Sequence, residues 1–159
     1  MCRIGIGHDT HRLRRGKQLV LGGVEIPDAP AGTVAHSDGD VLLHALVDAL
    51  LGAAGGGDIG DLFPNTDPRW KNASSDIFLA EALRRVRRKG FRVANADCIV
   101  FLERPALGSR KRDIAARVAK LLGVAPDAVG VKAKSGEGIG AIGRAAAVAA
   151  QAVVLLARG

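Results

Sequence analysis

The sequence predicts an α/β fold, more narrowly a two-layer α+β arrangement in which helices cover a mixed β-sheet. Segments with helical spacing of apolar residues alternate along the chain with runs that are typical of strands. Several helical segments are followed by glycine, the residue that most often ends a helix. The 159 residues, 48% of them apolar, are enough to bury one hydrophobic core, so we expect a single domain over residues 1–159.

The first third of the chain begins with two predicted strands, at residues 2–9 and 18–26, and a predicted loop at 29–37. From Asp38 onward, the sequence DGDVLLHALVDALLGAA has an acidic start and apolar residues at helical spacing. It therefore predicts a helix that ends at Gly55.

The middle of the chain contains a long segment, residues 57–75, that is rich in Gly, Pro, Asn and Asp. It is too long for a plain connection, and loops of that length are often functional. Residues 75–90 predict a second helix, which begins at Ser75 and ends at Gly90, and residues 91–102 predict a strand.

The last third of the chain predicts a third helix at residues 109–123 and a strand at 128–134. Residues 144–158 fit two structures from their composition alone. Their alanines favour a helix, whereas the run AVVLL suits a buried strand.

The composition indicates a cytoplasmic protein. The sequence has no uninterrupted apolar run of about 20 residues, as a membrane-spanning helix requires. The basic stretch HRLRR interrupts the first apolar stretch, which is not typical of a secretory signal. Two cysteines, Cys2 and Cys98, form no disulfide framework, so nothing favours an oxidising compartment.

The net charge of +7 favours anionic partners, which include nucleic acid, membrane surfaces and phosphorylated small molecules. Two runs, at residues 84–92 and 110–112, carry much of the excess, and we interpret them as solvated helix faces. With one Trp and no Tyr, the chain has few rings on which single-stranded nucleic acid could stack. We therefore expect no nucleic-acid partner and no membrane partner.

A carboxylate and two imidazoles form the first group of residues that carry chemistry. Asp9 and His11 lie two positions apart in a predicted strand and so share one face. His44 lies one turn into the first predicted helix, and such a set suits zinc or a similar divalent ion with one open position. Asp40, four residues before His44, is expected to orient a histidine as a hydrogen-bond acceptor. The alternative is that His44 is a hydrogen-bonded core histidine.

The segment KAKSGEGIGAIGR, residues 132–144, forms the second group. Its glycines allow backbone N–H groups to approach phosphate oxygens, and Ser135 adds a donor. Glu137 suits a hard cation such as Mg²⁺, which usually binds through one or two carboxylates together with substrate phosphates. By itself, the segment fits an ordinary glycine-rich turn equally well.

Four segments, taken in order, resemble the 2-C-methyl-D-erythritol 2,4-cyclodiphosphate synthase family. They are RIGIGHDTHRL, LGGVEIP, AHSDGDVLLHALVDALLGAAGGGDIGDLFPNTDP and KAKSGEGIGAIGR, and they span nearly the whole chain. The resemblance implies a lyase of the non-mevalonate isoprenoid pathway. It would close 4-diphosphocytidyl-2-C-methyl-D-erythritol 2-phosphate into the 2,4-cyclodiphosphate and release CMP.

The resemblance also implies an architecture and a set of site residues. Helices would pack on one face of the sheet, residues 144–158 would form a strand, and a homotrimer would place its sheets around a threefold axis, with active sites between subunits. Zn²⁺ would bind Asp9, His11 and His44, and Mg²⁺ or Mn²⁺ would bind Glu137 across the substrate phosphates. His36 and Ser135 would stabilise the transition state. The residues expected around the substrate are Asp9, Thr10, His11, His36, Ser37, Asp58, Ile59, Gly60, Phe63, Asn65, Asp67, Pro105, Ala106, Leu107, Gly108, Lys134, Ser135, Gly136, Glu137, Ala141 and Arg144.

Several positions differ from the family pattern, and the differences affect how the substrate is bound. Asn65 stands where many members have an acid, and Ala106 stands where a basic residue is frequent. Gly136 follows Ser135 in place of a second polar residue, and Ala141 replaces a common aromatic. Residues 145–147 are alanines where the family usually has Gly-Glu-Gly, beside a threefold cavity that can hold an isoprenoid diphosphate.

Two other functions use the same residues. A divalent-metal phosphohydrolase or nucleotidyl-transfer enzyme would have the same ligands but a different attacking group. A basic nucleic-acid-binding module would use zinc structurally, which normally requires four protein ligands, commonly cysteines. Cys2 and Cys98 lack that spacing. The role of His8, next to the first ligand, is not assigned by the sequence.

Overall fold

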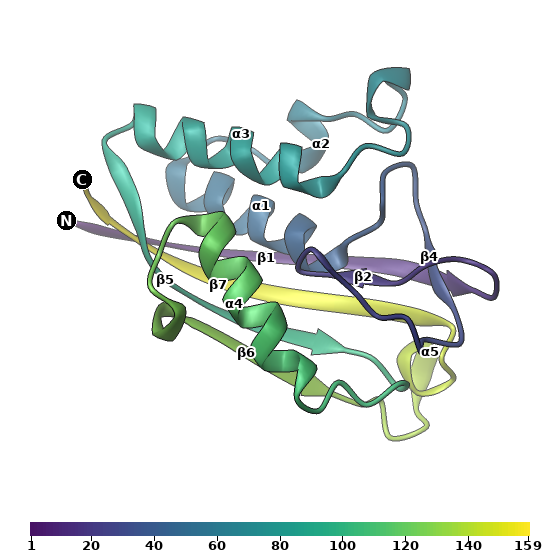
Figure 1. Cartoon of the computed structure of the whole chain (residues 1–159). Coiled ribbons are helices and arrows are strands. Elements are labelled where there is room, and N and C mark those ends of the chain that lie inside the picture. Colours follow the sequence, from purple (N-terminus) through teal and green to yellow (C-terminus); the bar gives the residue numbers. More distant parts are fainter.

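Five strands form one mixed sheet in the computed structural model, which describes residues 1–159 (Figure 1). All neighbouring strands are antiparallel except β5 and β6, which run parallel, so the predicted mixed sheet is confirmed. In spatial order, the strands are β4 (Gly32–Val34), β1 (Cys2–Arg14), β7 (Ala147–Arg158), β5 (Phe91–Phe101) and β6 (Val129–Lys134).

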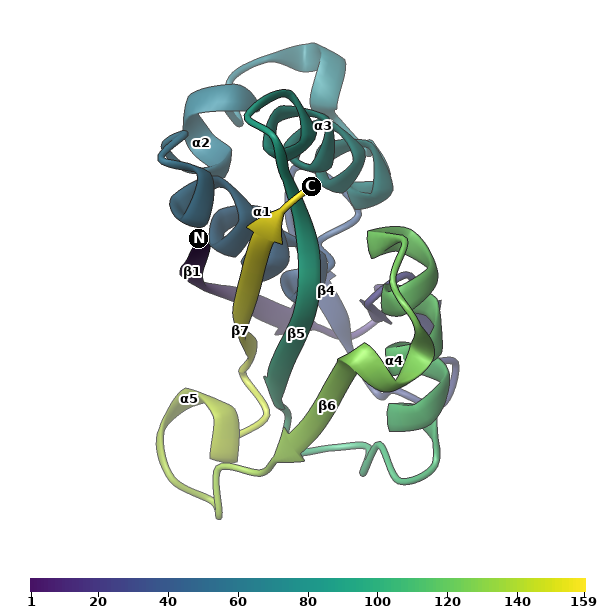
Figure 2. The same ribbon diagram turned by 90° about the vertical axis from the view of Figure 1, so that its left-hand side faces the viewer.

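Three long helices cover one face of this sheet: α1 (Val41–Ala54), α3 (Ser75–Arg88) and α4 (Arg110–Leu122). Figures 1 and 2 show all three on the same side, and they match the three predicted helices to within a few residues. α1 and α4 end at Gly55 and Gly123, whose left-handed φ values of 62° and 72° favour glycine. None of the helices has the length and apolar character needed to cross a membrane.

The first helix lies directly on the first strand because two glycines make room for it. A Cβ on Gly5 would be 1.9 Å from the carbonyl oxygen of Ala49, and one on Gly7 would be 1.9 Å from that of Ala45. Ile4 and Ile6, which alternate with these glycines, point to the exposed face of the sheet. This close approach carries the next residues of β1 toward the start of α1.

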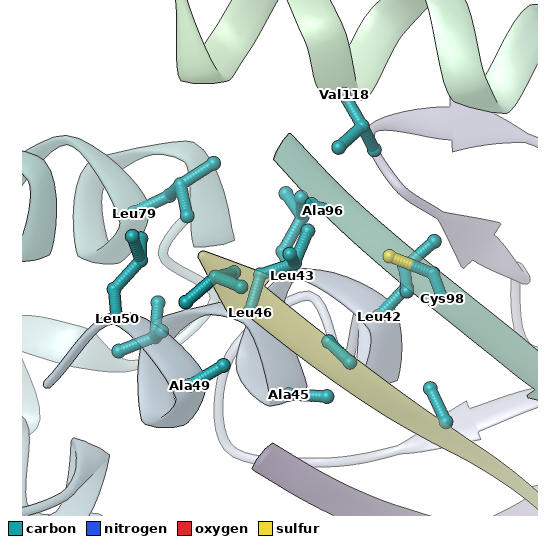
Figure 3. Packing of buried hydrophobic residues seen from close by; sticks show 14 of the residues in the cluster. Leu42, Leu43, Ala45, Leu46, Ala49, Leu50, Leu79, Ala96, Cys98 and Val118 are labelled. Carbon is teal, nitrogen blue, oxygen red and sulfur yellow. The ribbon is translucent and has the colours of Figure 1, made fainter. Parts of the chain in front are cut away.

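The hydrophobic core lies between the sheet and the helices, and α1 is at its centre. Twelve of the fourteen residues of α1 are buried. Figure 3 shows Leu42, Leu43 and Leu46 of this helix beside Cys98 of β5 and Val118 of α4. A helix buried on nearly all sides is a rigid base for any side chain that it carries toward a site.

Some predicted boundaries were wrong in the first half of the chain. Residues 18–26 form a hairpin of β2 (Val20–Leu21) and β3 (Val24–Glu25), because Gly22 and Gly23 turn the chain with φ values of 61° and 76°. The first strand continues to Arg14, and the predicted loop at 29–37 contains β4.

Short helices occupy two segments that the sequence predicts as irregular. The long loop at 57–75 contains α2 (Ile59–Leu62) and a 3₁₀ turn (Pro68–Trp70), and a second 3₁₀ turn (Pro126–Ala128) precedes β6. The short helix α5 (Gly140–Gly143) lies within the glycine-rich segment.

The alanine-rich end of the chain is the strand β7, as the family resemblance implies. It lies between β1 and β5 and hydrogen-bonds to both. Its position in the middle of the sheet overrides the preference of alanine for a helix.

Candidate active site

Asp9, His11 and His44 come together where β1 meets α1. The Nδ1 atom of His44 lies 2.9 Å from Oδ2 of Asp9, and Nδ1 of His11 lies 3.6 Å from the same oxygen. One potential ligand atom from each of the three residues lies within 4.8 Å of those of the other two. The alternation of β1 brings Asp9 and His11 to the same face, as predicted.

The chemistry of this triad fits a divalent cation. His11 Nε2 is buried and has no hydrogen-bond partner, which is costly for a polar atom unless a ligand satisfies it. Burial opposes ionisation of Asp9, but the imidazoles of His11 and His44 beside it and a hydrogen bond with the Thr10 backbone lower the pKa of Asp9 below its ordinary value. An ionised carboxylate and two imidazoles form the usual protein ligand set of a catalytic zinc site with an open position.

Asp40 does not support a histidine, so that prediction was wrong. Its carboxylate caps α1 by accepting hydrogen bonds from the backbone N–H groups of Leu42 and Leu43, and it also accepts from those of Gly22 and Gly23. These four donors occupy the carboxylate and tie the β2–β3 hairpin to the helix. Burial raises the pKa of Asp40 to about 6, and the backbone hydrogen bonds oppose a larger rise.

The triad opens into a cavity of about 490 Å³. Nine of the predicted site residues line it, together with four that sequence analysis missed. The predicted ones are Asp9, His11, His36, Ser37, His44, Ile59, Gly60, Phe63 and Asn65, and the missed ones are Ala35, Pro64, Trp70 and Phe78.

The missed aromatic residues, Trp70 and Phe78, form one cluster with the predicted Phe63 along the cavity wall. The ring centroids of Phe63 and Phe78 are 4.5 Å apart, and the Trp70 ring meets that of Phe63 edge-on at 5.1 Å. The chain has only four Phe and one Trp. The presence of Phe63 and Trp70 in the long polar loop was therefore a signal that could have identified this wall.

His36 is held at the cavity by the loop that follows α2. Its Nε2 lies 3.1 Å from the backbone carbonyl oxygen of Asp67, and its own carbonyl accepts a 2.7 Å hydrogen bond from the Asn72 N–H. Because a carbonyl only accepts, Nε2 of His36 carries the proton and Nδ1 is left for other contacts. The Asp67 side chain is turned to Arg69, which lowers the pKa of the Asp67 carboxyl.

Two acidic residues hold α2 in place, and its residues Ile59 and Gly60 form the floor of the cavity. Asp58 caps α2 by accepting from the Asp61 N–H, and Asp48 of α1 accepts a 2.8 Å hydrogen bond from the Ile59 N–H. Burial raises the pKa of Asp48. Asp48 is not among the residues predicted from the sequence, although its position four residues after His44 places it on the same side of α1.

The remaining predicted site residues do not line this cavity. Thr10 projects to the opposite, exposed face of β1, where its Oγ1 lies 3.0 Å from His8 Nε2. Leu107 is part of the hydrophobic core, so its side chain is withdrawn from ligands. Also outside the lining are Asp58, Asp67, Pro105, Ala106, Gly108, Lys134, Ser135, Gly136, Glu137, Ala141 and Arg144.

The glycine-rich loop, defined here as residues 135–144, has an internal structure of its own. Ser135 Oγ donates a 2.9 Å hydrogen bond to Glu137 Oε1, and Glu103 accepts a 2.8 Å hydrogen bond from the Gly136 N–H. Residue 136 must be glycine here because a Cβ would lie 2.3 Å from the backbone nitrogen of Gly143. Ser135 and Glu137 are both exposed to solvent.

Comparison with known proteins gives consistent matches over the whole chain. The model of the YgbB family matches residues 2–157. The 2-C-methyl-D-erythritol 2,4-cyclodiphosphate synthase of Treponema denticola is 48% identical over 97% of this chain and 95% of its own length. A solved structure of 2C-methyl-D-erythritol-2,4-cyclodiphosphate synthase in a CDP-bound form is 45% identical, with a TM-score of 0.90, and the match covers 98% of this chain and 100% of that one.

Another similar structure is that of the bifunctional IspDF from Campylobacter jejuni. It has a TM-score of 0.95 and 40% identity over 100% of this chain. The chain spans 43% of that bifunctional protein. The fold described above therefore occurs both as a separate protein and as one part of a longer one.

Proposed function

The chain belongs to the YgbB family, and from this premise we propose that its cavity is the active site of a 2-C-methyl-D-erythritol 2,4-cyclodiphosphate synthase. This lyase converts 4-diphosphocytidyl-2-C-methyl-D-erythritol 2-phosphate into 2-C-methyl-D-erythritol 2,4-cyclodiphosphate and CMP. The observation that carries the assignment is the convergence of Asp9, His11 and His44 on one cavity in a chain of this family.

The reaction needs positioning and charge neutralisation more than it needs a protein nucleophile. An oxygen of the 2-phosphate bonds to the β-phosphorus of the diphosphate, while the bond from that phosphorus to the CMP oxygen breaks. Both partners are anions, so they must be held together against their mutual repulsion. Phosphoryl transfers of this kind depend on fixed geometry and on cationic groups around the phosphates.

In the proposed mechanism, Asp9, His11 and His44 hold Zn²⁺ or another divalent ion. When bound there, the ion supplies positive charge to a phosphate oxygen at its open position. The buried, unpartnered His11 Nε2 and the lowered pKa of Asp9 support this assignment. These three residues orient the diphosphate, and the aromatic wall limits access of water to it.

His36 acts on the reacting phosphates in this proposal. The Asp67 carbonyl accepts from Nε2–H and keeps the ring in place, and in the doubly protonated ring Nδ1–H also donates, to a phosphate oxygen. The erythritol part would lie along the floor of the cavity, against Ile59, Gly60 and Asn65. Because Asn65 is neutral, it holds a substrate hydroxyl without adding negative charge near the phosphates.

The glycine-rich loop and residues 105–108 complete the site from a second subunit. Glu137 would hold Mg²⁺ or Mn²⁺, which would neutralise phosphate charge, Ser135 would donate to a phosphate oxygen, and the backbone of residues 105–108 would contact the cytosine. None of these residues lines the cavity within one chain, which supports a site shared between chains.

A homotrimer with active sites between its subunits accounts for the separation of the cavity from the glycine-rich loop and residues 105–108. The uncovered face of the sheet carries Ile4 and Ile6, which are 72% and 69% exposed, together with Val153. Adjacent apolar side chains on a free sheet face are typical of a subunit interface. Packing of this face around a threefold axis would bury them.

The function can be tested by following the phosphorus atoms of the substrate. We expect the purified chain, given the diphosphocytidyl substrate and Mg²⁺, to form a cyclic diphosphate and one CMP per turnover, detected by ³¹P NMR. A phosphohydrolase on the same ligands would release CMP and a linear phosphate product instead. CMP release without the cyclic product would overturn the proposal.

A further inference from the structure

A buried serine stands behind His44, on the side of the ring that faces away from Asp9. Ser75 is the first residue of α3 and is wholly buried. Its Oγ lies 2.9 Å from His44 Nε2, and its backbone N–H donates a 2.9 Å hydrogen bond to Oδ2 of Asp38. The Ser75 hydroxyl also hydrogen-bonds to Oδ1 of Asp38. Ser37 Oγ makes a longer contact, 3.3 Å, with the same His44 nitrogen.

The donors and acceptors in this group fix the direction of each hydrogen bond. An ionised Asp38 can only accept, so the single hydroxyl proton of Ser75 points to Asp38. The Ser75 oxygen must then accept from His44, which places the ring proton on Nε2. In the neutral ring, Nδ1 of His44 is consequently a bare lone pair, and it faces the Asp9 carboxylate at 2.9 Å.

Two electron-pair acceptors at that distance repel each other unless a positive charge lies between or beside them. The hydrogen bond at Nε2 of His44 therefore leaves Nδ1, on the opposite side of the ring, able to bind a cation. Ser75 lies 31 positions after His44 in the sequence, and Asp38 lies 37 positions before Ser75.

We propose that Ser75 and Asp38 are positioning residues that hold His44 as its Nε2–H tautomer and so present Nδ1 to a divalent cation. The inference rests on the metal centre of the proposed function. Hydrogen bonds from a metal-ligating histidine to an outer acceptor orient the ring and increase its basicity as a ligand. Sequence analysis assigned this task to Asp40, whose oxygens accept from four backbone N–H groups instead.

The first test determines the tautomer of His44 without any metal. In the ¹⁵N-labelled, metal-free chain, we expect the long-range ¹H–¹⁵N pattern of His44 to show a proton on Nε2. In Asp38→Asn, the new amide group can donate to Ser75 Oγ, which frees the serine proton to point at His44 and moves the ring proton to Nδ1. A wild-type ring protonated only on Nδ1 would overturn the proposal, even if Asp38→Asn failed to fold.

The second test measures zinc affinity by competition with a chelator. Ser75→Ala removes the acceptor, and we expect the Kd for zinc to rise about 10- to 100-fold, the usual effect of losing such an outer partner. The matched control is Ser74→Ala, because the neighbouring Ser74 is exposed and its side chain makes no capping hydrogen bond. We expect the control to bind zinc like the wild type.

The two tests separate this inference from the metal centre on which it rests. An unchanged zinc Kd in folded Ser75→Ala would overturn the positioning role while leaving the triad as the ligand set. A wild-type chain that binds no zinc would overturn the metal centre itself, and the tautomer measurement would still decide how His44 is held.

Discussion

The Asp9–His11–His44 triad and the glycine-rich loop differ in how much support each receives from its own chain. Each triad residue is at least half-buried on a long regular element, and α1 beneath it is packed on nearly all sides. In the loop, Ser135 and Glu137 are exposed and hydrogen-bond mainly to each other. One chain thus builds a complete pocket around the triad, whereas the loop has a defined shape without a cavity of its own.

In the proposed site shared between subunits, the two regions have different tasks. The pocket needs fixed distances because a cation tolerates little error in its ligands. The loop needs backbone N–H groups that can approach phosphates closely, which favours glycine and exposure. Four experiments test whether the triad and the loop differ in this way.

Removal of a triad ligand should have the largest effect. In His44→Ala, we expect most bound zinc to be lost and activity to fall by about 1000-fold or more, because metal-ion charge stabilisation is worth several kcal/mol. Elemental analysis and the ³¹P assay measure the two effects. His8→Ala, which removes an exposed imidazole from the opposite face of β1, is the control and should keep its zinc. Full zinc content in His44→Ala would refute the ligand assignment.

Mixing two impaired variants tests whether the two regions meet across subunits. His44→Ala lacks the pocket and Glu137→Gln lacks the loop carboxylate, so at a Mg²⁺ concentration that limits Glu137→Gln each homotrimer should have little activity. After joint refolding in equal amounts, about one quarter of all sites in the randomly assembled trimers would combine two intact halves. We expect activity to recover to a corresponding fraction. No recovery in verified heterotrimers would confine the site to one chain.

Substitution of the Glu137 carboxylate should raise the Mg²⁺ requirement and leave the zinc content unchanged. In Glu137→Gln, we expect the Mg²⁺ concentration for half-maximal activity to rise about tenfold, because one charged ligand to a hard cation is lost. Zinc content should equal that of the wild type, since the triad is intact. A superimposable Mg²⁺ titration would argue that Glu137 holds no cation.

A substitution that stabilises α1, the helix beneath the pocket, should have the smallest effect. Gly52 lies within α1, and a Cβ there would meet no atom within 4 Å. Gly52→Ala should therefore stabilise the chain by about 0.5–1 kcal/mol, which thermal unfolding would detect as a raised Tm. Activity should not change, because the helix is already rigid. A clear loss of activity would indicate that the pocket depends on movement of α1.

Much of the fold follows from local patterns. The apolar spacing and the terminal glycines located all three long helices, and the alternation in β1 put Asp9 and His11 on one face. The hairpin at 18–26 was missed because Gly22 and Gly23 turn the chain within a run of strand-forming residues. The strand at the end of the chain was ambiguous in composition because its alanines favour a helix in isolation.

The sequence by itself determined which residues could bind a metal, since residue type and a period of two or four depend only on near neighbours. Only the tertiary structure decided which groups support them. Asp40 belongs to the hairpin and the helix cap, and Ser75 stands behind His44 although 31 positions separate the two residues. The physical reason is that a hydrogen bond requires contact within about 3 Å. Local spacing cannot specify which distant side chain the packing of α3 on α1 will bring to that distance.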